Sequence, residues 1–257
     1  MFKIFKMNSG EILTSIEKGV GTIQFSHPAS NSFPSTLLNR LIDNIKRLDA
    51  DETVKILVLK SAGERAFCAG ASFDELMAIK NLDDGKQFFM GFANLINTMR
   101  KSKKLIIGRV QGKAVGGGVG IISACDYVFA TENASVKLSE LSIGIGPFVI
   151  EPAVERKIGV SALSELSLDA THWQTAYWAQ KKGLYHKVFK NLREMDNAIY
   201  DFTTKLASYN PQALTEMKKV LWKNTDNWDI LLAERAEISG KLVLSDFTKR
   251  ALQKFKK

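Results

Sequence analysis

Residues 105–131 read LIIGRVQGKAVGGGVGIISACDYVFAT, and this stretch decides the fold. The apolar run 105–110 is followed by the glycines 116–118, a short apolar segment at 119–124 and a second apolar run at 126–131. Short apolar runs bounded by turn residues are typical of buried strands. The stretch therefore predicts a strand, a glycine hinge, a short helix and a second strand in succession.

The same alternation precedes this stretch. Residues 12–25 predict two strands that turn at 17–19, and residues 54–59 predict a further buried strand. Apolar residues at helical spacing predict one helix after Pro34 and another over 84–100. Strands and helices that alternate at this rate imply parallel βαβ units, so the predicted fold class is α/β.

The strand pattern stops in the last quarter of the chain. A capping asparagine and a proline at 210–211 predict a helix start, and residues 228–244 predict another helix. We therefore expect two regions, an α/β core over residues 1–195 and a helical region over residues 196–257. The helical region would pack on its own core or on a partner chain.

Composition sets the class of protein. The 257 residues are 45% hydrophobic and 25% charged, as in ordinary globular proteins, and no apolar run is long enough to cross a bilayer. Residues 1–6 lack the apolar stretch of a signal peptide, and the two cysteines, Cys68 and Cys125, suit a reducing compartment. We expect a cytoplasmic protein whose net charge of +9 attracts anionic partners.

Several common motifs are missing from the sequence. The glycines at 116–118 match neither a nucleotide P-loop nor a dinucleotide fingerprint, and no serine lies in a nucleophile elbow. The three histidines, His27, His172 and His186, are far apart in the sequence, so a histidine-rich metal site is not expected.

Three segments remain that suit chemistry: 67–72, 112–120 and 138–147. The first two are loops of small residues directly after predicted strands, and such residues let a ligand approach backbone N–H groups closely. One N–H group from each loop could hold a carbonyl oxygen as it gains negative charge. Glycines also permit tight helix–strand packing, so the glycine loop alone does not decide between the two roles.

The combination of motifs resembles the crotonase, or enoyl-CoA hydratase/isomerase, family. The motifs are Phe-x-Ala-Gly-Ala at 67–71, Gly-x-Ala-x-Gly-Gly-Gly at 112–118, Ala-Cys-Asp at 124–126 and Ser-Glu at 139–140. The resemblance covers nearly the whole chain. The Gly-Gly-Gly-hydrophobic-Gly run and the Ile-Gly-x-x-Pro segment at 143–147 are similar to the bacterial methylglutaconyl-CoA hydratase-like branch.

The resemblance implies a crotonase-like spiral of ββα units followed by a C-terminal helical trimerisation region. It implies a homotrimer or a dimer of trimers, acyl-CoA thioester substrates and no metal or redox cofactor, with coenzyme A present only as part of the substrate. Neither a membrane nor a nucleic acid is expected as a partner.

The resemblance also assigns roles by position. The N–H groups of Ala71 and Gly117 would form an oxyanion hole, and the Ala69 carbonyl would face the adenine of coenzyme A. Gly70 and Gly116 would belong to the same coenzyme A-binding loops.

The hydratases of this family have two glutamates, and here the sequence departs from them. Glu140 matches the second glutamate, whereas Gly120 stands at the position of the first. Adding water to a double bond needs both a base and an acid. We expect Glu140 to act as the acid/base group, with a pKa raised by its apolar sequence neighbours Leu138, Leu141 and Ile143.

Other positions refine this expectation. Glu151 is a second candidate carboxylate, and Ser72 replaces an aspartate of the family, which should change loop hydrogen bonds. Phe148 replaces an acid that dienoyl isomerases need, so that subtype is not expected. Lys249 or Arg250 could meet the phosphates of coenzyme A.

Three functions stay open from the sequence. The first is a hydratase-type lyase that adds water to, or removes it from, an acyl-CoA thioester, with a branched substrate of leucine breakdown as an attractive case. The second is a double-bond isomerase, which needs a single glutamate. The third is a non-catalytic protein that binds coenzyme A or RNA, suggested by Gly120 and the basic charge. The retention of Glu140 favours an enzyme.

Overall fold

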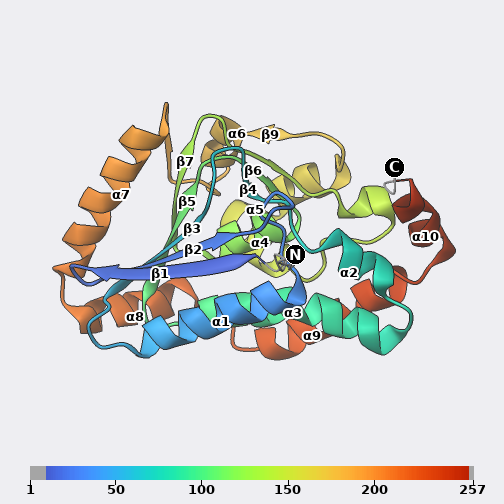
Figure 1. Cartoon of the computed structure of the whole chain (residues 1–257), viewed down its shortest axis with the longest axis horizontal. Coiled ribbons are helices and arrows are strands. Elements are labelled where there is room, and N and C mark those ends of the chain that lie inside the picture. The colour runs from blue at the N-terminus through green and yellow to red at the C-terminus, as the bar shows by residue number, and fades with distance from the viewer. Residues whose placement is uncertain (1–9, 255–257) are drawn as a thin grey trace, which may run out of the picture.

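The computed structural model describes residues 10–254, and its chain path is shown in Figure 1. The prediction that no signal peptide is present rested on residues 1–6, and these lie outside the described range. Two sheets form the centre, and helices surround them (Figure 1). None of the described helices has the length and apolar character needed to span a membrane.

The larger sheet has six strands in the order β1-β2-β3-β5-β7-β10. Its strands are β1 (Glu11–Glu17), β2 (Val20–Ser26), β3 (Ile56–Ser61), β5 (Leu105–Val110), β7 (Tyr127–Thr131) and β10 (Lys187–Phe189). The β1–β2 pair is antiparallel and the other neighbouring pairs are parallel. The pairing confirms the parallel βαβ units that were predicted from the alternation of strands and helices.

Both faces of this sheet are buried, and strand β3 shows why. Leu57 and Leu59 belong to one hydrophobic core, whereas Ile56 and Val58 belong to a second core on the opposite face. Successive side chains of a strand point to opposite faces, so a strand between two cores needs a continuous apolar run. The two cores therefore explain why residues 54–59 are almost continuously apolar.

Helices cover the two faces. The first core includes residues of α1 (Ser35–Ala50), α3 (Leu82–Lys101), α4 (Gly117–Ala124) and α5 (Glu151–Leu168). The second core includes residues of α7 (Leu192–Ala207) and α8 (Pro211–Leu221). Two short helices, α2 (Phe73–Ala78) and α6 (Ala176–Lys181), lie in the connections.

The smaller sheet positions the site described below. Its strands are β4 (Ala66–Cys68), β6 (Lys113–Val115), β8 (Ser135–Lys137) and β9 (Gln174–Thr175), in that order. Strands β4, β6 and β8 are parallel, and β9 is antiparallel to β8. Each has only two or three residues, which is too short for a periodic pattern, and the sequence did not predict them as a sheet.

Helices follow β10 to the end of the described range. As predicted, α8 starts at Pro211, and Asn210 caps it by accepting the N–H groups of Gln212 and Ala213. The last two helices are α9 (Trp228–Leu242) and α10 (Asp246–Gln253). The division of the chain into residues 1–195 and 196–257 as separate regions stays a prediction.

Helix α9 crosses α3 at a pair of glycines. A methyl group built on Gly85 would lie 2.9 Å from the Cα atom of Gly240. The two backbones can approach this closely only because neither residue has a side chain. The crossing places α9 along the wall of the site, with the Ser239 side of the helix facing inward.

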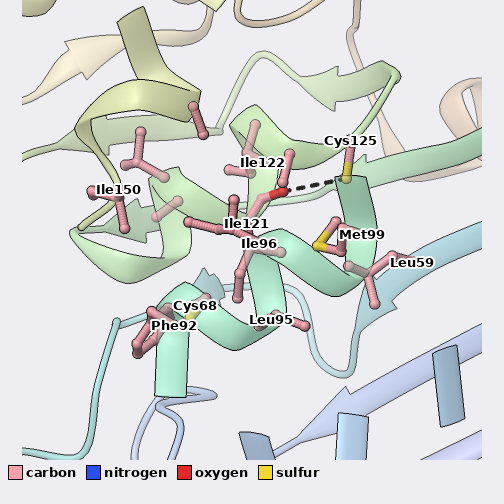
Figure 2. Packing of buried hydrophobic residues seen from close by; sticks show 14 of the residues in the cluster. Leu59, Cys68, Phe92, Leu95, Ile96, Met99, Ile121, Ile122, Cys125 and Ile150 are labelled. Carbon is pink, nitrogen blue, oxygen red and sulfur yellow. Dashed lines mark hydrogen bonds between the residues drawn. The ribbon is translucent and has the colours of Figure 1, made fainter. Parts of the chain in front are cut away.

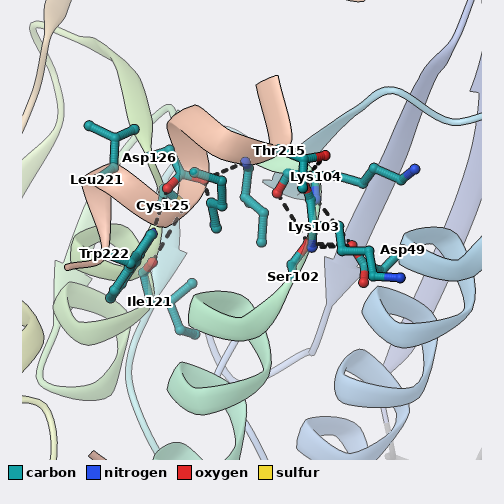
Figure 3. A network of polar contacts seen from close by, with 12 residues as sticks. Asp49, Ser102, Lys103, Lys104, Ile121, Cys125, Asp126, Thr215, Leu221 and Trp222 are labelled. Atoms are coloured by element: carbon teal, nitrogen blue, oxygen red, sulfur yellow. Dashed lines mark hydrogen bonds and ion pairs between the residues drawn. The ribbon is translucent and has the colours of Figure 1, made fainter. Parts of the chain in front are cut away.

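A buried carboxylate attaches α8 to the core. Asp126 accepts hydrogen bonds from Lys218 Nζ at 2.6 Å, from Trp222 Nε1 at 2.7 Å and from the Ile106 N–H at 2.7 Å (Figure 3). The Asp126 and Lys218 side chains are only 2% and 3% exposed. A buried charge without a partner is costly, so this ion pair fixes where α8 can lie.

A second carboxylate joins α1 to the turn after α3. Asp49 Oδ1 accepts hydrogen bonds from Ser102 Oγ and from the N–H groups of Lys103 and Lys104 (Figure 3). Thr215 of α8 donates to the Lys103 carbonyl. The start of β5 is therefore held from both sides.

Candidate functional site

A cavity of about 340 Å³ lies where strands β4, β6 and β8 end. The carboxyl ends of parallel strands meet at one edge of a sheet, so the segments that follow them converge. Ala71 follows β4, Gly117 follows β6 and Glu140 follows β8, and all three line this cavity. The structure thus brings together the three residues predicted as catalytic.

The walls of the cavity are mostly apolar. Helices α2 and α3 contribute five of the lining side chains: Phe73, Leu76, Phe88, Phe89 and Phe92. The segment between Glu140 and α5 contributes further apolar side chains: Ile143, Ile145, Pro147, Val149 and Ile150. The polar side chains of the lining are Lys137, Ser139, Glu140, Ser142 and Ser239. A small number of polar groups in an apolar cavity is typical of a small-molecule site.

The two predicted N–H donors lie on adjacent loops. A methyl group built on Gly70 would lie 3.6 Å from the nitrogen of Gly117. In the bridge between Phe33 and Ala71, the Phe33 N–H donates to the Gly70 carbonyl and the Ser72 N–H donates to the Phe33 carbonyl. The bridge therefore leaves the Ala71 N–H unused. Gly117 is the first residue of α4, where an N–H group has no partner within the helix.

Two positions in the loop after β6 have room only for glycine, because other side chains lie against them. Gly116 has a φ of +52°, and a methyl group built on it would lie 2.7 Å from Glu140 Oε1. A methyl group on Gly117 would overlap the ring of Phe92. Glu140 therefore lies against this loop, and Phe92 packs directly on the residue predicted to supply one donor.

Glu140 begins a short 3₁₀ segment, η1 (Glu140–Ile143), and its carboxylate points into the protein. Oε2 is buried, with no hydrogen-bond partner among the described residues, although other parts of the residue are accessible. Burial raises the pKa of Glu140 to about 7, and hydrogen bonds from backbone N–H groups oppose this rise. Near neutral pH this carboxyl group can both accept and return a proton.

The apolar surroundings of Glu140 differ from those predicted. Of the three sequence neighbours named above, only Ile143 lines the cavity. Leu138 is buried in the core, and Leu141 is 41% exposed. Burial raises the pKa as predicted, and the apolar side chains that share the cavity with Glu140 come mostly from other parts of the chain.

Ile150 also fills the space next to Gly120. Gly120 is fully buried in α4, and a methyl group built on it would lie 2.5 Å from Ile150 Cγ2 (Figure 2 shows Ile150 in this core). Gly120 stands where the hydratases that this sequence resembles have their first glutamate. The Ile150 side chain therefore fills the space that such a glutamate would need. Among the described residues that line the cavity, Glu140 is the only carboxylate.

The residues predicted to bind coenzyme A also lie here. Ala69, Gly70 and Gly116 all line the cavity, and Ala69 is exposed at its edge. Ser72 has a different role, because its hydroxyl caps α2 by accepting the Glu75 N–H. This bond agrees with the prediction that Ser72 affects loop hydrogen bonding.

Glu151 does not line the cavity. It starts α5 and lies 3.5 Å from Arg235 Nη2. Burial and the neighbouring Glu155 raise the pKa of Glu151 to about 7 as well. Position rather than pKa therefore separates the two candidate carboxylates, and only Glu140 can reach a ligand in the cavity.

Lys249 and Arg250 lie on α10 and do not line the cavity. Helix α10 packs against the 3₁₀ segment that begins with the candidate catalytic carboxylate. A methyl group built on Gly144 would lie 2.5 Å from both Phe247 Cδ1 and Thr248 Oγ1. The contact of these basic residues with coenzyme A phosphates stays a prediction.

Several lining residues were not predicted from the sequence, and Phe92, Ile150 and Ser239 are examples. Phe92 lies on the apolar face of the helix predicted over 84–100, which was the one available signal. Ile150 and Ser239 reach the cavity from separate helical segments, and nothing local in the sequence distinguishes them from ordinary core residues.

Two relatives that match this chain over nearly its whole length are named as hydratases. It is 25% identical to a probable enoyl-CoA hydratase of Bacillus subtilis over 246 residues, covering 95% of each chain. It is 26% identical to a short-chain-enoyl-CoA hydratase of Clostridium acetobutylicum over 252 residues, covering 97% of this chain and 95% of the relative.

Solved structures agree on the fold. The crystal structure of an enoyl-CoA hydratase from Bacillus halodurans superposes with a TM-score of 0.86 at 19% identity, covering 95% of this chain and 99% of that one. The observed architecture is therefore the crotonase fold predicted from the motifs. The family model described as enoyl-CoA hydratase/isomerase matches residues 15–256. With the fold and nearly the whole sequence in agreement, this chain belongs to the enoyl-CoA hydratase/isomerase family.

Proposed function

We propose that this protein moves the double bond of an enoyl-CoA thioester, using Glu140 as a single proton carrier. The observation that supports this proposal is the combination of one buried carboxylate in the cavity with an apolar side chain at the second position. Glu140 has a raised pKa, and Ile150 closes the space beside Gly120. Isomerisation needs one group that takes and returns a proton, whereas hydration divides its work between a base and an acid.

The proposed reaction starts from a 3-enoyl thioester whose carbonyl oxygen lies between the Ala71 and Gly117 N–H groups. The Glu140 carboxylate removes a proton from C2, and the C–H electron pair moves into a dienolate. The two N–H groups stabilise the negative charge that develops on oxygen. Glu140 then returns the proton to C4, which leaves a 2-enoyl thioester with no change in mass.

The cavity suits these steps physically. Its apolar walls keep the carboxyl group neutral more easily, which raises its affinity for the transferred proton. Phe92 and Ile150 add apolar side chains to the lining, which makes the cavity less favourable for water. A dienolate that is protected from water returns to product rather than to side reactions.

Hydration is the second candidate, and the full-length relatives favour it. Both relatives compared above are named hydratases. In this chain a single glutamate would have to activate water and protonate the α-carbon in turn. A branched substrate of leucine breakdown, the trimer or dimer of trimers and the cytoplasmic location belong to this proposal as predictions.

The test is turnover on a panel of thioesters, with products resolved by mass. The panel contains a 3-enoyl-CoA, crotonyl-CoA, 3-methylcrotonyl-CoA and 3-methylglutaconyl-CoA. We expect conversion of the 3-enoyl-CoA without a change in mass, and a loss of about 10²- to 10⁴-fold in kcat for Glu140→Gln. The matched control is Glu151→Gln, which removes the other carboxyl group of raised pKa and should retain activity.

The remaining outcomes separate the candidates. A gain of one water that depends on Glu140 would replace isomerisation by hydration, and the best substrate would identify the acyl class. Full activity of Glu140→Gln would contradict both mechanisms. Binding of coenzyme A thioesters without any turnover in the wild-type protein would favour the non-catalytic alternative.

A further inference from the structure

Cys68 lies beneath the candidate oxyanion hole and is fully buried. It is the last residue of β4, and it pairs in register with Ala114 of β6. Both predicted N–H donors follow these two strands. Figure 2 shows Cys68 in the core together with Phe92, whose ring packs on one of the donor residues.

The first contact of Cys68 is with the loop that contains Ala71. The Gly70 N–H donates a hydrogen bond to Cys68 Sγ at 3.3 Å, and both groups are buried. Gly70 has a φ of +89°, a conformation that glycine adopts readily, so this loop can turn back towards the sulfur. Because Gly70 directly precedes Ala71, this bond helps to set the direction of the Ala71 N–H.

The second contact is with the first turn of α4. A methyl group built on Gly118 would lie 2.6 Å from the Cys68 carbonyl oxygen, 2.9 Å from its Cβ and 3.2 Å from its Sγ. The Cys68 side chain therefore packs directly on the residue that follows Gly117. One side chain touches the backbone next to both donors.

We propose that Cys68 is a positioning residue that sets the spacing of the Ala71 and Gly117 N–H groups. It does so by accepting the Gly70 N–H and by packing on Gly118. This inference rests on the proposed function, because it assumes that these two N–H groups bind the thioester oxygen. Electrostatic stabilisation depends on donors that are held in place before the reaction, so a displaced donor lowers the rate.

A nucleophilic role for Cys68 does not fit the structure. Burial raises the pKa of its thiol to about 12, so the sulfur stays protonated at neutral pH. A neutral sulfur is a weak acceptor that can still pair with a backbone N–H. Cys68 does not line the cavity, and so it acts only through the backbone of its neighbours.

The test compares Cys68→Ala, which removes the acceptor, with Cys68→Ser, which keeps one. We expect Cys68→Ala to lower kcat about 10-fold, less than the loss of a whole oxyanion donor, while KM changes less than about 2-fold. Cys68→Ser should recover most of this loss. An interaction that acts mainly in the transition state lowers kcat rather than substrate binding.

Cys125→Ala is the matched control. Cys125 is also fully buried, and burial raises the pKa of its thiol to about 12. Its Sγ lies 3.4 Å from the Ile121 carbonyl oxygen, away from the cavity lining (Figure 2). Cys125→Ala should lower the melting temperature to a similar extent as Cys68→Ala and leave kcat unchanged.

A measurement without turnover separates this proposal from the proposed function. An aryl-conjugated 2-enoyl-CoA absorbs at longer wavelength when its carbonyl group is polarised. We expect a red shift on binding to the wild-type protein and to Cys125→Ala, and a smaller shift for Cys68→Ala. A wild-type shift that Cys68→Ala fully retains would overturn the positioning role. The absence of any shift in the wild-type protein would instead contradict the oxyanion hole itself.

Discussion

The substitution Glu140→Gln should make the protein more stable at neutral pH. The carboxylate lies in an apolar cavity and its Oε2 has no hydrogen-bond partner among the described residues, so ionisation is opposed by burial. Glutamine has the same shape and no charge. The substitution therefore removes the cost of holding a negative charge in this position.

The size of the effect follows from the two pKa values. Burial raises the pKa of Glu140 from an ordinary 4.5 to about 7. At 1.36 kcal/mol per tenfold change in proton affinity, this difference corresponds to about 3 kcal/mol of unfolding free energy. The folded state binds the proton more tightly than the unfolded state. The stabilisation that this bound proton gives the folded wild-type protein is thus complete below pH 4.5, declines as the pH rises, and is lost above about pH 7. The advantage of the glutamine variant grows over the same range.

The assay is urea denaturation of the wild-type protein and Glu140→Gln at several pH values from 4.5 to 8. The difference in unfolding free energy between the two proteins cancels the titration of the other groups. We expect the glutamine variant to gain about 3 kcal/mol relative to the wild type across this range. A difference that stays constant with pH would show that Glu140 is solvated or paired, and would refute the reasoning.

Two further predictions concern packing. Gly120→Glu should lower the free energy of unfolding by about 1–3 kcal/mol or more, because the new side chain overlaps Ile150. Adding Ile150→Ala should recover part of that stability. Thermal unfolding of the single and double variants measures both effects. If Gly120→Glu alone is as stable as the wild type, the position faces open space instead. Lys218→Ala should lower the free energy of unfolding by about 3–5 kcal/mol, because it leaves the Asp126 carboxylate buried without its charged partner. The exposed neighbour variant Lys219→Ala should change stability by less than about 0.5 kcal/mol, and equal losses in the two variants would contradict the role of the buried pair.

The sequence predicted the elements that have a clear period or a clear cap. The strand over 54–59, the helix after Pro34 and the helix start at 210–211 all had such signals, and the structure contains them. The three-residue strands of the small sheet had none, because three residues cannot show a period. Strands β4 and β6 lie inside segments that the sequence predicted as loops.

The site was predictable in part for the same reason. Ala71, Gly117 and Glu140 lie in segments whose residue types suggest chemistry, and each lies two or three residues after a strand of the smaller sheet. Ile150 became important only through its contact with Gly120 in the folded chain. No local pattern reports such a contact, since it depends on how α4 and the start of α5 pack.

The crossing of α3 and α9 has a consequence for the synthesis of the protein. Ser239 of α9 lines the cavity, and Phe247 of α10 supports Gly144 beside Glu140. A nascent chain that has left the ribosome only as far as β10 already contains the Ala71, Gly117 and Glu140 segments, yet its cavity lacks a wall. The cavity can therefore be complete only after α9 and α10 have also emerged and docked.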